Sequence, residues 1–298
     1  MKFAYIALIS AGLLLTACGG GGGGSSDPTP DPIAAMNEAD FGVGVTPIVI
    51  PISNLAEFTD AKAKIQANSG NFVLNITKPI EVGDAEAFIA PTTNTIISLR
   101  GGGTIYKSSG TNILFYLSDP EDSQKLILRD VTLKGHTTGV NNSLVYVRDG
   151  AVFNMYDGGT ITGNKSDFGG AVSINGGVFN MYGGTISDNE VIYNGGGVCV
   201  SDGAFNMSGG TISGNKAVTY GGGVLVDFGN GGTFTKTGGT IYGSGDATNK
   251  NEAGGSGKGH AVFVGVDGGS NDKYRDTTLG NTSGGNISTD NLTSGWNE

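Results

Sequence analysis

The chain has 298 residues, of which 55 are glycine and only 15% are charged, and its formal net charge is −10. An acidic chain without basic runs argues against nucleic-acid binding and against electrostatic attraction to anionic lipid. Two cysteines exclude a disulfide framework, and two histidines without a close cysteine pair give no transition-metal constellation. We therefore expect neither a metal nor another cofactor.

The first residues have the pattern of a secretory signal. Lys2 precedes an apolar run from Phe3 to Leu15, which is too short to span a membrane as a helix. The residues Leu-Thr-Ala-Cys18 resemble the lipobox of bacterial lipoproteins. This resemblance implies that residues 1–17 are removed and that Cys18 carries a lipid, which would attach the protein to a membrane. An ordinary cleaved signal is the alternative. Gly19 replaces the aspartate that retains enterobacterial lipoproteins at the inner membrane, so the resemblance favours the outer membrane or cell surface of a bacterial envelope.

Residues 18–45 have the composition of a flexible tether, rich in glycine and then proline. Residues 46–70 are expected to form an N-terminal cap, in which Asn54 or Ser53 begins a helix from Leu55 to Ala67. One side of this helix is apolar, with Leu55, Phe58, Ala61 and Ile65. An open solenoid end would expose apolar surface and free strand edges, so this helix is the natural lid.

A repeated unit dominates residues 150–226 of the remaining segment, 71–298. Phe153, Phe179 and Phe205 recur every 26 residues, and each unit ends in a glycine pair and an apolar strand. Apolar residues alternate within the unit, which is typical of strands with one buried face. Because one unit cannot bury that face alone, the repeat predicts stacked coils. We expect an all-β fold, a right-handed parallel β-helix of about eight coils and roughly 40 Å in length.

Stacking places identical residues in columns. The three phenylalanines are expected to form one internal column, with a methionine column and an isoleucine column beside it. The other internal residues are Met155, Met181, Met207, Ile161, Ile186 and Ile212. Asparagines fall at the corner after the third strand of each unit, where stacked amides can form hydrogen bonds from coil to coil. These residues are Asn164, Asn189 and Asn215.

The coils before and after the repeat are less regular. Strands with inward alternation are expected at 72–76, 96–99, 113–117, 126–128, 131–133 and 144–147. After the repeat, Phe234 begins a degraded copy in which Lys236 takes the methionine position, and this suggests that the core narrows or the register changes. Residues 243–259 are predicted to form a glycine-rich loop, and 265–298 an irregular coil or cap.

Two further sets of side chains are assigned to packing. Cys199 stands between two inward valines, so the alternation points it outward as a packing residue. Phe168, Tyr193 and Tyr220 each precede a glycine pair and are expected to cover a corner of the helix.

The units, each with Gly-Gly-Thr-Ile followed by a turn asparagine, resemble the repeats of the pectate-lyase-like superfamily of right-handed β-helices. They are more similar to the Gly-Gly-Thr-Ile-Ser-Gly-Asn repeats of spirochaete and Bacteroidetes surface lipoproteins, and loosely similar to polymorphic membrane protein adhesins. The resemblance covers about residues 72–264 and is strongest from 150 to 226. It implies the fold and an envelope location. It leaves the activity open, because the superfamily contains both enzymes and adhesins.

A row of polar and aromatic residues is the first candidate site. If the phenylalanines and methionines point inward, the residues between and after them point outward on one flat sheet. These are Asn154, Tyr156, Asn180, Tyr182, Asn206 and Ser208. Amides beside aromatic faces can form hydrogen bonds with a sugar chain and stack on it. The leading hypothesis is an adhesin-like or structural surface for a glycan or a host-cell ligand. An ordinary solvated β-face is the alternative.

A polysaccharide-active lyase or hydrolase is the other hypothesis. Such an enzyme needs a carboxylate cluster or a Ca²⁺ site with a basic residue nearby. No such cluster stands out in the sequence: Asp188 is isolated, and His136 and His260 lie outside the motifs expected of polygalacturonases. The best candidate is a group of basic residues expected to point outward on neighbouring coils, as a catalytic or anion-binding site or as a plain solvated face. Its members are Arg100, Lys107, Arg129 and Lys134.

Overall fold

A computed structural model describes most of the chain after the predicted signal and tether. The described residues are 36, 39–84, 88–89, 94–119, 124–138, 142–167, 169–227, 230–254, 258–265, 272–280 and 287–288. The predicted signal, Cys18 and most of the predicted tether therefore lie outside the described residues, as does Phe168.

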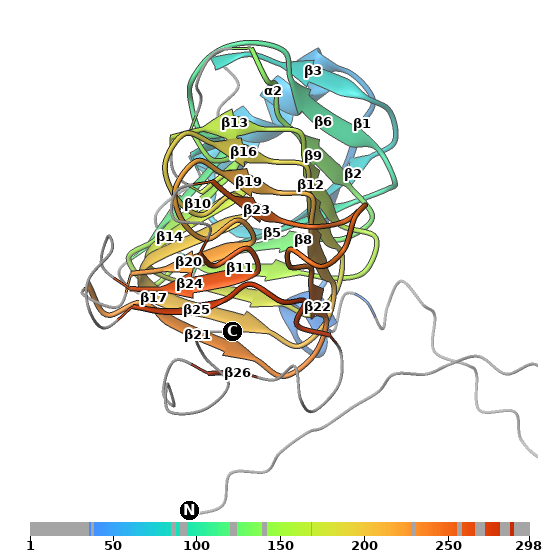
Figure 1. The fold of residues 1–298 in the computed structure, drawn as a ribbon. Coiled ribbons are helices and arrows are strands. Elements are labelled where there is room, and N and C mark those ends of the chain that lie inside the picture. The colour runs from blue at the N-terminus through green and yellow to red at the C-terminus, as the bar shows by residue number, and fades with distance from the viewer. Residues whose placement is uncertain are drawn as a thin grey trace, which may run out of the picture.

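The described strands form a parallel β-solenoid of about seven turns, which confirms the predicted fold class with slightly fewer coils than expected (Figure 1). The largest sheet contains two rows of strands. Its first row comprises β1 (Ile48–Ile52), β2 (Gly70–Ile76), β5 (Thr95–Arg100), β8 (Lys125–Leu128), β11 (Val152–Met155), the second halves of β14 (Val172–Met181) and β17 (Val198–Met207), and β21 (Thr233–Lys236). Its second row comprises β4 (Phe88–Ile89), β7 (Phe115–Ser118), β10 (Val145–Arg148), the first halves of β14 and β17, β20 (Val224–Val226) and β24 (Val262–Val264).

Two smaller sheets complete each turn. The second sheet comprises β3 (Ile80–Val82), β6 (Thr104–Lys107), β9 (Thr132–Lys134), β12 (Thr160–Thr162), β15 (Thr185–Ser187), β18 (Thr211–Ser213) and β22 (Thr240–Ile241). The third comprises β13 (Lys165–Ser166), β16 (Glu190–Val191), β19 (Lys216–Ala217) and β23 (Glu252–Ala253). The last of these strands lies within the predicted loop 243–259, so the loop prediction is wrong at that point.

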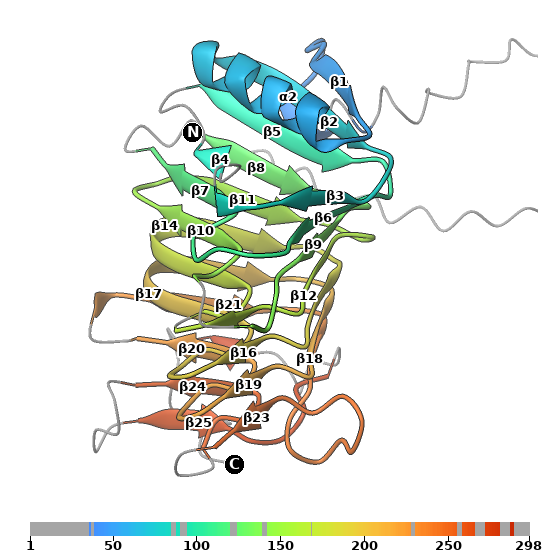
Figure 2. The same cartoon turned by 90° about the horizontal axis from the view of Figure 1, so that it is seen from above.

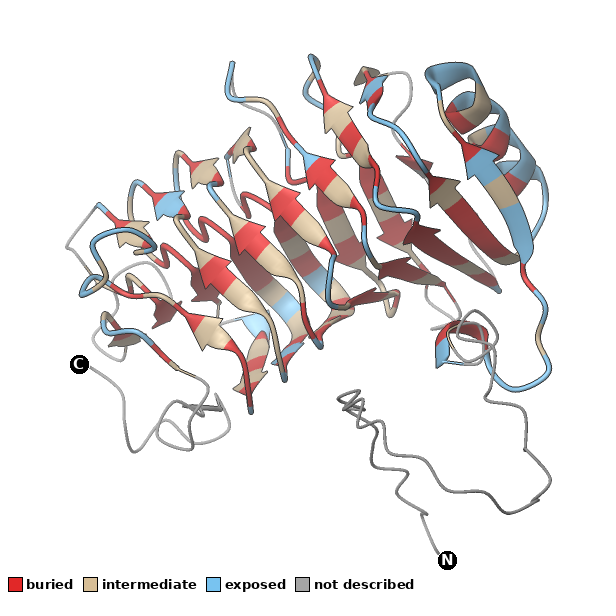
Figure 3. Ribbon diagram, turned by 90° about the vertical axis from the view of Figure 1, so that its right-hand side faces the viewer, coloured by how far each residue is buried: buried red, intermediate tan, exposed pale blue. Residues whose placement is uncertain are grey.

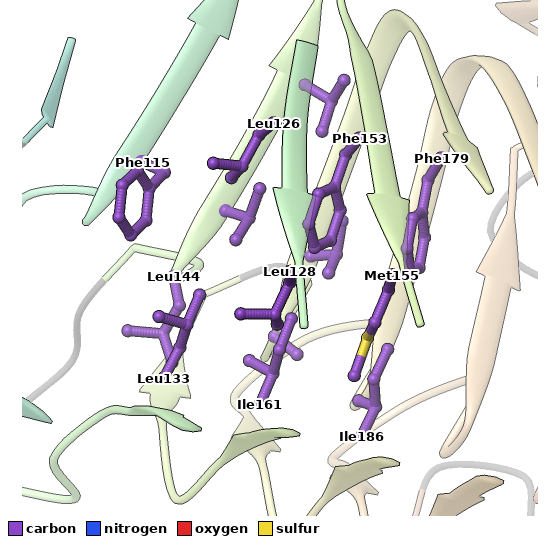
Figure 4. Close-up of a cluster of buried hydrophobic side chains, with 14 of the residues drawn as sticks. Phe115, Leu126, Leu128, Leu133, Leu144, Phe153, Met155, Ile161, Phe179 and Ile186 are labelled. Atoms are coloured by element: carbon purple, nitrogen blue, oxygen red, sulfur yellow. The ribbon is translucent and has the colours of Figure 1, made fainter. Parts of the chain in front are cut away.

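Columns of identical side chains fill the interior, as the sequence predicted. The rings of Phe153 and Phe179 lie side by side, with their centroids 4.8 Å apart (Figure 4). The centroids of Phe179 and Phe205 are also 4.8 Å apart, and those of Phe205 and Phe234 are 4.9 Å apart. The methionine and isoleucine columns are also buried. Figure 3 shows buried and less buried residues alternating along the strands. The inward face of each strand is therefore the one that the alternation of apolar residues indicated.

A buried ladder of asparagines runs along one corner of the solenoid. The backbone N–H of Asn164 donates to Oδ1 of Asn189 at 3.1 Å, and that of Asn189 donates to Oδ1 of Asn215 at 3.1 Å. Asn215 donates in the same way to Asn251 at 2.9 Å. The prediction of coil-to-coil hydrogen bonds is confirmed. Asn251, which lies 36 residues after Asn215, extends the ladder beyond the regular repeat.

The N-terminal end is covered by α2 (Leu55–Ala67), which lies beside β1 and β2 (Figure 2). Asn54 is its N-cap, and its side chain accepts a hydrogen bond from the N–H of Glu57 at 3.0 Å. Phe58, Ala61 and Ile65 are buried, as expected. Leu55 is instead 41% exposed, because at the first helical position it lines an open surface hollow rather than the core.

The folded structure begins earlier than the sequence suggested. Asp40 and Phe41 are only 3% and 8% exposed, although both fall in the predicted tether 18–45. The centre of the Arg100 guanidinium lies 5.9 Å from the centroid of the Phe41 ring. This N-terminal segment, residues 39–41 together with Met36, therefore packs on the solenoid. The glycine and proline composition around it could not reveal that contact.

The C-terminal end is closed by antiparallel pairing. β25 (Lys273–Arg275) pairs with β24, and β26 (Ile287–Ser288) pairs with β21. Lys236 stays in register with Met207, so the suggested change of register is wrong. Its side chain is 1% exposed, and its Nζ donates to the carbonyl of Gly280 at 2.8 Å. The methionine column thus ends in a buried lysine whose ammonium group meets the closing segment.

Candidate functional site

The first row of strands brings the predicted asparagines together on its outer face. Asn154, Asn180 and Asn206 are in register on β11, β14 and β17. Nδ2 of Asn180 donates to Oδ1 of Asn154 at 2.9 Å, and Nδ2 of Asn206 donates to Oδ1 of Asn180 at 3.0 Å. Asn180 and Asn206 therefore each use one amide donor to hold the preceding asparagine. Asn154 is only 8% exposed, while Asn206 is exposed, so the accessible end of this ladder is at Asn206.

The two tyrosines follow the same strands and stack on each other. Tyr156 comes directly after β11 and Tyr182 directly after β14, and their ring centroids are 4.9 Å apart with 23° between the planes. The guanidinium carbon of Arg129 lies 3.6 Å from the centroid of the Tyr156 ring. Tyr156 is therefore in contact with an aromatic ring and with a guanidinium group, and burial raises its pKa. Tyr182 is 47% exposed and offers the accessible aromatic surface of this site.

A buried aspartate joins two of the predicted basic residues. Nη2 of Arg100 lies 2.6 Å from Oδ2 of Asp40, and Nη2 of Arg129 lies 2.8 Å from Oδ1. Nε of Arg129 also donates to Oδ1 at 3.0 Å, and the Ser98 hydroxyl donates to Oδ2 at 2.7 Å. The Asp40 side chain is completely buried. The two arginines are therefore ion-paired to the N-terminal segment rather than presented to solvent.

The two lysines of the predicted basic group do not join the arginines. The outward position expected for Lys107 is wrong, because its side chain is 2% exposed. It points inward from β6, where it donates a hydrogen bond to the carbonyl of Asn112 and lies 3.7 Å from Asp84. Burial lowers its pKa, and the nearby Asp84 carboxylate opposes that change. Lys134 is exposed on β9 in the second sheet, so the four residues do not form one cluster.

The remaining polar candidates have local structural partners. Among the described residues, no group of three or more His, Cys, Asp or Glu side chains could hold a metal ion. His136 shares a hydrogen bond with the carbonyl of Gly110, and Nδ1 of His260 accepts from the N–H of Ala253. Asp188 has a positive φ of 56°, and the neighbouring coils have glycine at this turn position.

Cys199 points away from the main core but is covered. It is 5% exposed and packs with Leu225 and Phe263, beside Tyr220. This confirms its predicted role as an outward packing residue. Tyr220 stacks on Phe263 at 4.4 Å, as a covering residue should. Tyr193 is 48% exposed, and its covering role stays a prediction.

Sequence analysis missed Asp40 and the contact between Arg129 and Tyr156. The corresponding phrases Leu99-Arg100 and Leu128-Arg129 had already placed the two arginines in one register. Two adjacent cations on neighbouring strands repel each other unless an anion lies between them, and this was the available signal. No family model, curated protein or solved structure matches this chain. None of the helices in the described part of the chain is long and apolar enough to cross a membrane.

Proposed function

We propose that this protein is a lipid-anchored bacterial cell-envelope protein that binds an extended glycan, in the manner of an adhesin, on the outer face of its first row. The observation that carries the proposal is the half-exposed ring of Tyr182, backed by Tyr156 and next to the exposed end of the asparagine ladder at Asn206. An aromatic face with adjacent amides suits a sugar ring, which has an apolar face and polar hydroxyl groups.

The rigidity of this face favours binding. Tyr182 rests on Tyr156, which contacts Arg129, and Arg129 is fixed by Asp40. The side chains are thus held before a ligand arrives, so little side-chain entropy remains to be lost on binding. The strands repeat at roughly 4.8 Å, and a flat, regular face of this kind suits an extended chain better than a compact ligand.

The anchor is a separate part of the proposal and rests on the Leu-Thr-Ala-Cys18 motif. Cys18→Ala should release the protein from the membrane fraction, because a lipidated N-terminus is the only strong membrane signal that the sequence shows once the signal segment is removed. Globomycin should cause the precursor to accumulate. A Cys18→Ala protein with a cleaved signal that stays tightly membrane-bound would contradict lipidation.

Tyr182→Ala tests the glycan-binding face. Loss of an exposed aromatic contact at the centre of a site is expected to weaken binding by about tenfold or more. The measurement is binding of the purified protein to an array of long neutral and acidic glycans, with melting temperature as a check on folding. Tyr193→Ala is the matched control, since Tyr193 is 48% exposed and Tyr182 47%. Equal binding by the wild type and Tyr182→Ala would refute this site.

Polysaccharide cleavage stays the alternative function. Its best candidate residues were Arg100 and Arg129, and both are ion-paired to the buried Asp40. Removing the arginine charges should therefore affect folding more than any turnover. We favour binding over cleavage because no observation on the described residues favours a catalytic cluster at this position.

A further inference from the structure

A second outer face carries a column of side chains that changes abruptly in size. On the second row, β7, β10, β14, β17, β20 and β24 stack in register, and one outward position runs through all six strands. From the N-terminal to the C-terminal side, this position is occupied by Tyr116, Tyr146, Ser173, Cys199, Leu225 and Phe263. Two small residues thus separate two pairs of large ones.

The gap left by the small residues is a hollow of about 300 Å³. Tyr146 lies at one side, and Ser173 and Cys199 contribute to its lining together with Asn142, Asp167 and Ser201. On the other side the column resumes with Leu225, which packs against Cys199. A volume of this size is at the small end of the range for ligand pockets, which suits one ring-sized group rather than a long chain.

The walls of the hollow are held by contacts outside it. The Tyr146 and Tyr116 rings pack with their centroids 5.6 Å apart, and Nδ2 of Asn175 donates to the Tyr146 hydroxyl at 3.3 Å. Nδ2 of Asn142 donates to the carbonyl of Thr111 at 2.7 Å. The aromatic wall and one polar wall are therefore positioned without a ligand, so binding needs little reorganisation.

The chemistry of the lining identifies the class of ligand. It combines the aromatic ring of Tyr146 and the apolar side chain of Ile113 with hydroxyl, thiol, amide and carboxylate groups, and none of its described residues is a lysine, arginine or histidine. Among the described lining residues the only charged group is the carboxylate of Asp167, which would repel an acidic sugar and can accept hydrogen bonds from hydroxyl groups. We propose that this hollow binds a single neutral sugar ring, stacked on Tyr146 and hydrogen-bonded at the rim by Asp167 and Ser201.

Cys199 contributes to the hollow as a packing group rather than as a nucleophile. Burial raises the pKa of its thiol to about 11, so the thiol is neutral at physiological pH and the reactive thiolate is scarce. The proposed role of the hollow is therefore recognition, without a covalent step. The hollow lies on the second row, whereas Tyr182 belongs to the first, so this site does not rest on the proposed function of the first row.

Ser173→Leu tests the hollow by filling it. Leucine already occupies the same outward position at Leu225, and phenylalanine does so at Phe263. The local backbone therefore accommodates a large side chain there, and the substitution leaves the main core untouched. Tyr146→Ala is the second variant, which removes the aromatic wall instead of filling the space. Tyr182→Ala is the control, because it alters the first row alone.

The probes are the short neutral oligosaccharides maltotetraose, cellotetraose and chitotetraose, with tetragalacturonate as the acidic probe, measured by calorimetry and by saturation-transfer NMR. We expect at least one neutral probe to bind the wild type, with affinity about tenfold or more lower in both hollow variants and unchanged in Tyr182→Ala. The proposal is overturned if no neutral probe binds, if tetragalacturonate binds more tightly, or if both folded hollow variants bind as the wild type does. Loss of binding in Tyr182→Ala alone would assign the sugar to the first row and also overturn this site.

Discussion

Replacing Lys236 by methionine should stabilise the protein, because this lysine is buried at the end of a methionine column. Lys236 is in register with Met207 and is 1% exposed. Its ammonium group donates to the carbonyl of Gly280 at 2.8 Å, and no ion pair with Lys236 is found among the described residues. Burial lowers its pKa from 10.5 to about 8. The folded state therefore disfavours the charged form.

The gain in stability expected for Lys236→Met depends on pH. The difference between 10.5 and about 8 corresponds to a penalty of roughly 3 kcal/mol on the charged lysine. Below pH 8 both the folded and the unfolded chain carry the proton, so the full penalty is present. Between pH 8 and 10.5 the unfolded chain binds more protons, so the stability of the wild type rises with pH. Methionine removes the penalty but leaves the Gly280 carbonyl without this donor, which costs about 1 kcal/mol.

The free energy of unfolding in urea measures this effect at pH 7 and pH 10. We expect Lys236→Met to be about 2 kcal/mol more stable than the wild type at pH 7, with a smaller gain at pH 10. Lys134→Met, which changes an exposed lysine on β9, is the control and should stay within about 0.5 kcal/mol at both pH values. A methionine variant that is less stable at pH 7, or equally stabilised at both pH values, would refute the reasoning.

Four further substitutions test the packing of the solenoid by thermal and urea unfolding. Phe179→Ala should lower the free energy of unfolding by roughly 3 to 5 kcal/mol, because its ring stacks on a phenylalanine on each side. The adjacent Asn180→Ala, on the outer face, should lower it by about 1 kcal/mol. Equal losses would mean that the inward and outward faces are misassigned. Asn215→Ala should lower the free energy of unfolding by about 2 to 4 kcal/mol, since it leaves the buried backbone N–H of Asn189 without its acceptor and removes the hydrogen bonds that Asn215 Nδ2 donates. A loss under about 1 kcal/mol would contradict the ladder. Asp40→Asn should lower the free energy of unfolding by roughly 3 kcal/mol and make the segment at residues 39–41 more sensitive to limited proteolysis. Unchanged stability and cleavage would show that the ion pairs contribute little.

The interior of the solenoid could be predicted from the sequence because the repeat and the alternation act together. A side chain that faces inward on one coil has the same neighbour above and below, so Phe179 and Met181 could be placed without coordinates. The repeat also predicted the asparagines at the corner. It did not predict Asn251, because an insertion before this residue breaks the spacing of 26 residues, although the hydrogen bonds of the corner continue.

The outer faces were less predictable because their burial depends on segments that carry no repeat. Asn154 was expected to be accessible, but it is 8% exposed. Arg100 and Arg129 were expected to be solvated, and Asp40 from the N-terminal segment pairs with both. The alternation of apolar residues predicts which face of the strand a side chain occupies. It does not predict whether a distant part of the chain covers that face.

Stable packing and ligand binding favour different arrangements of the side-chain columns in a solenoid. Inward columns are stable when every coil carries the same residue, because identical rings stack at the strand spacing and leave no void. A uniform outward column, by contrast, offers a ligand many equivalent positions and therefore no single preferred one. A defined site on such a scaffold needs a break in an outward column.

Two outward columns of this chain have such breaks. Ser173 and Cys199 interrupt a column of large residues on the second row, and Tyr182 is followed by Ser208 on the first row. Behind the hollow the inward column continues unchanged, because Val172, Val198 and Val224 remain buried and in register. The packing of the core is thus independent of these changes on the surface, so outward residues on this fold can vary without loss of the core.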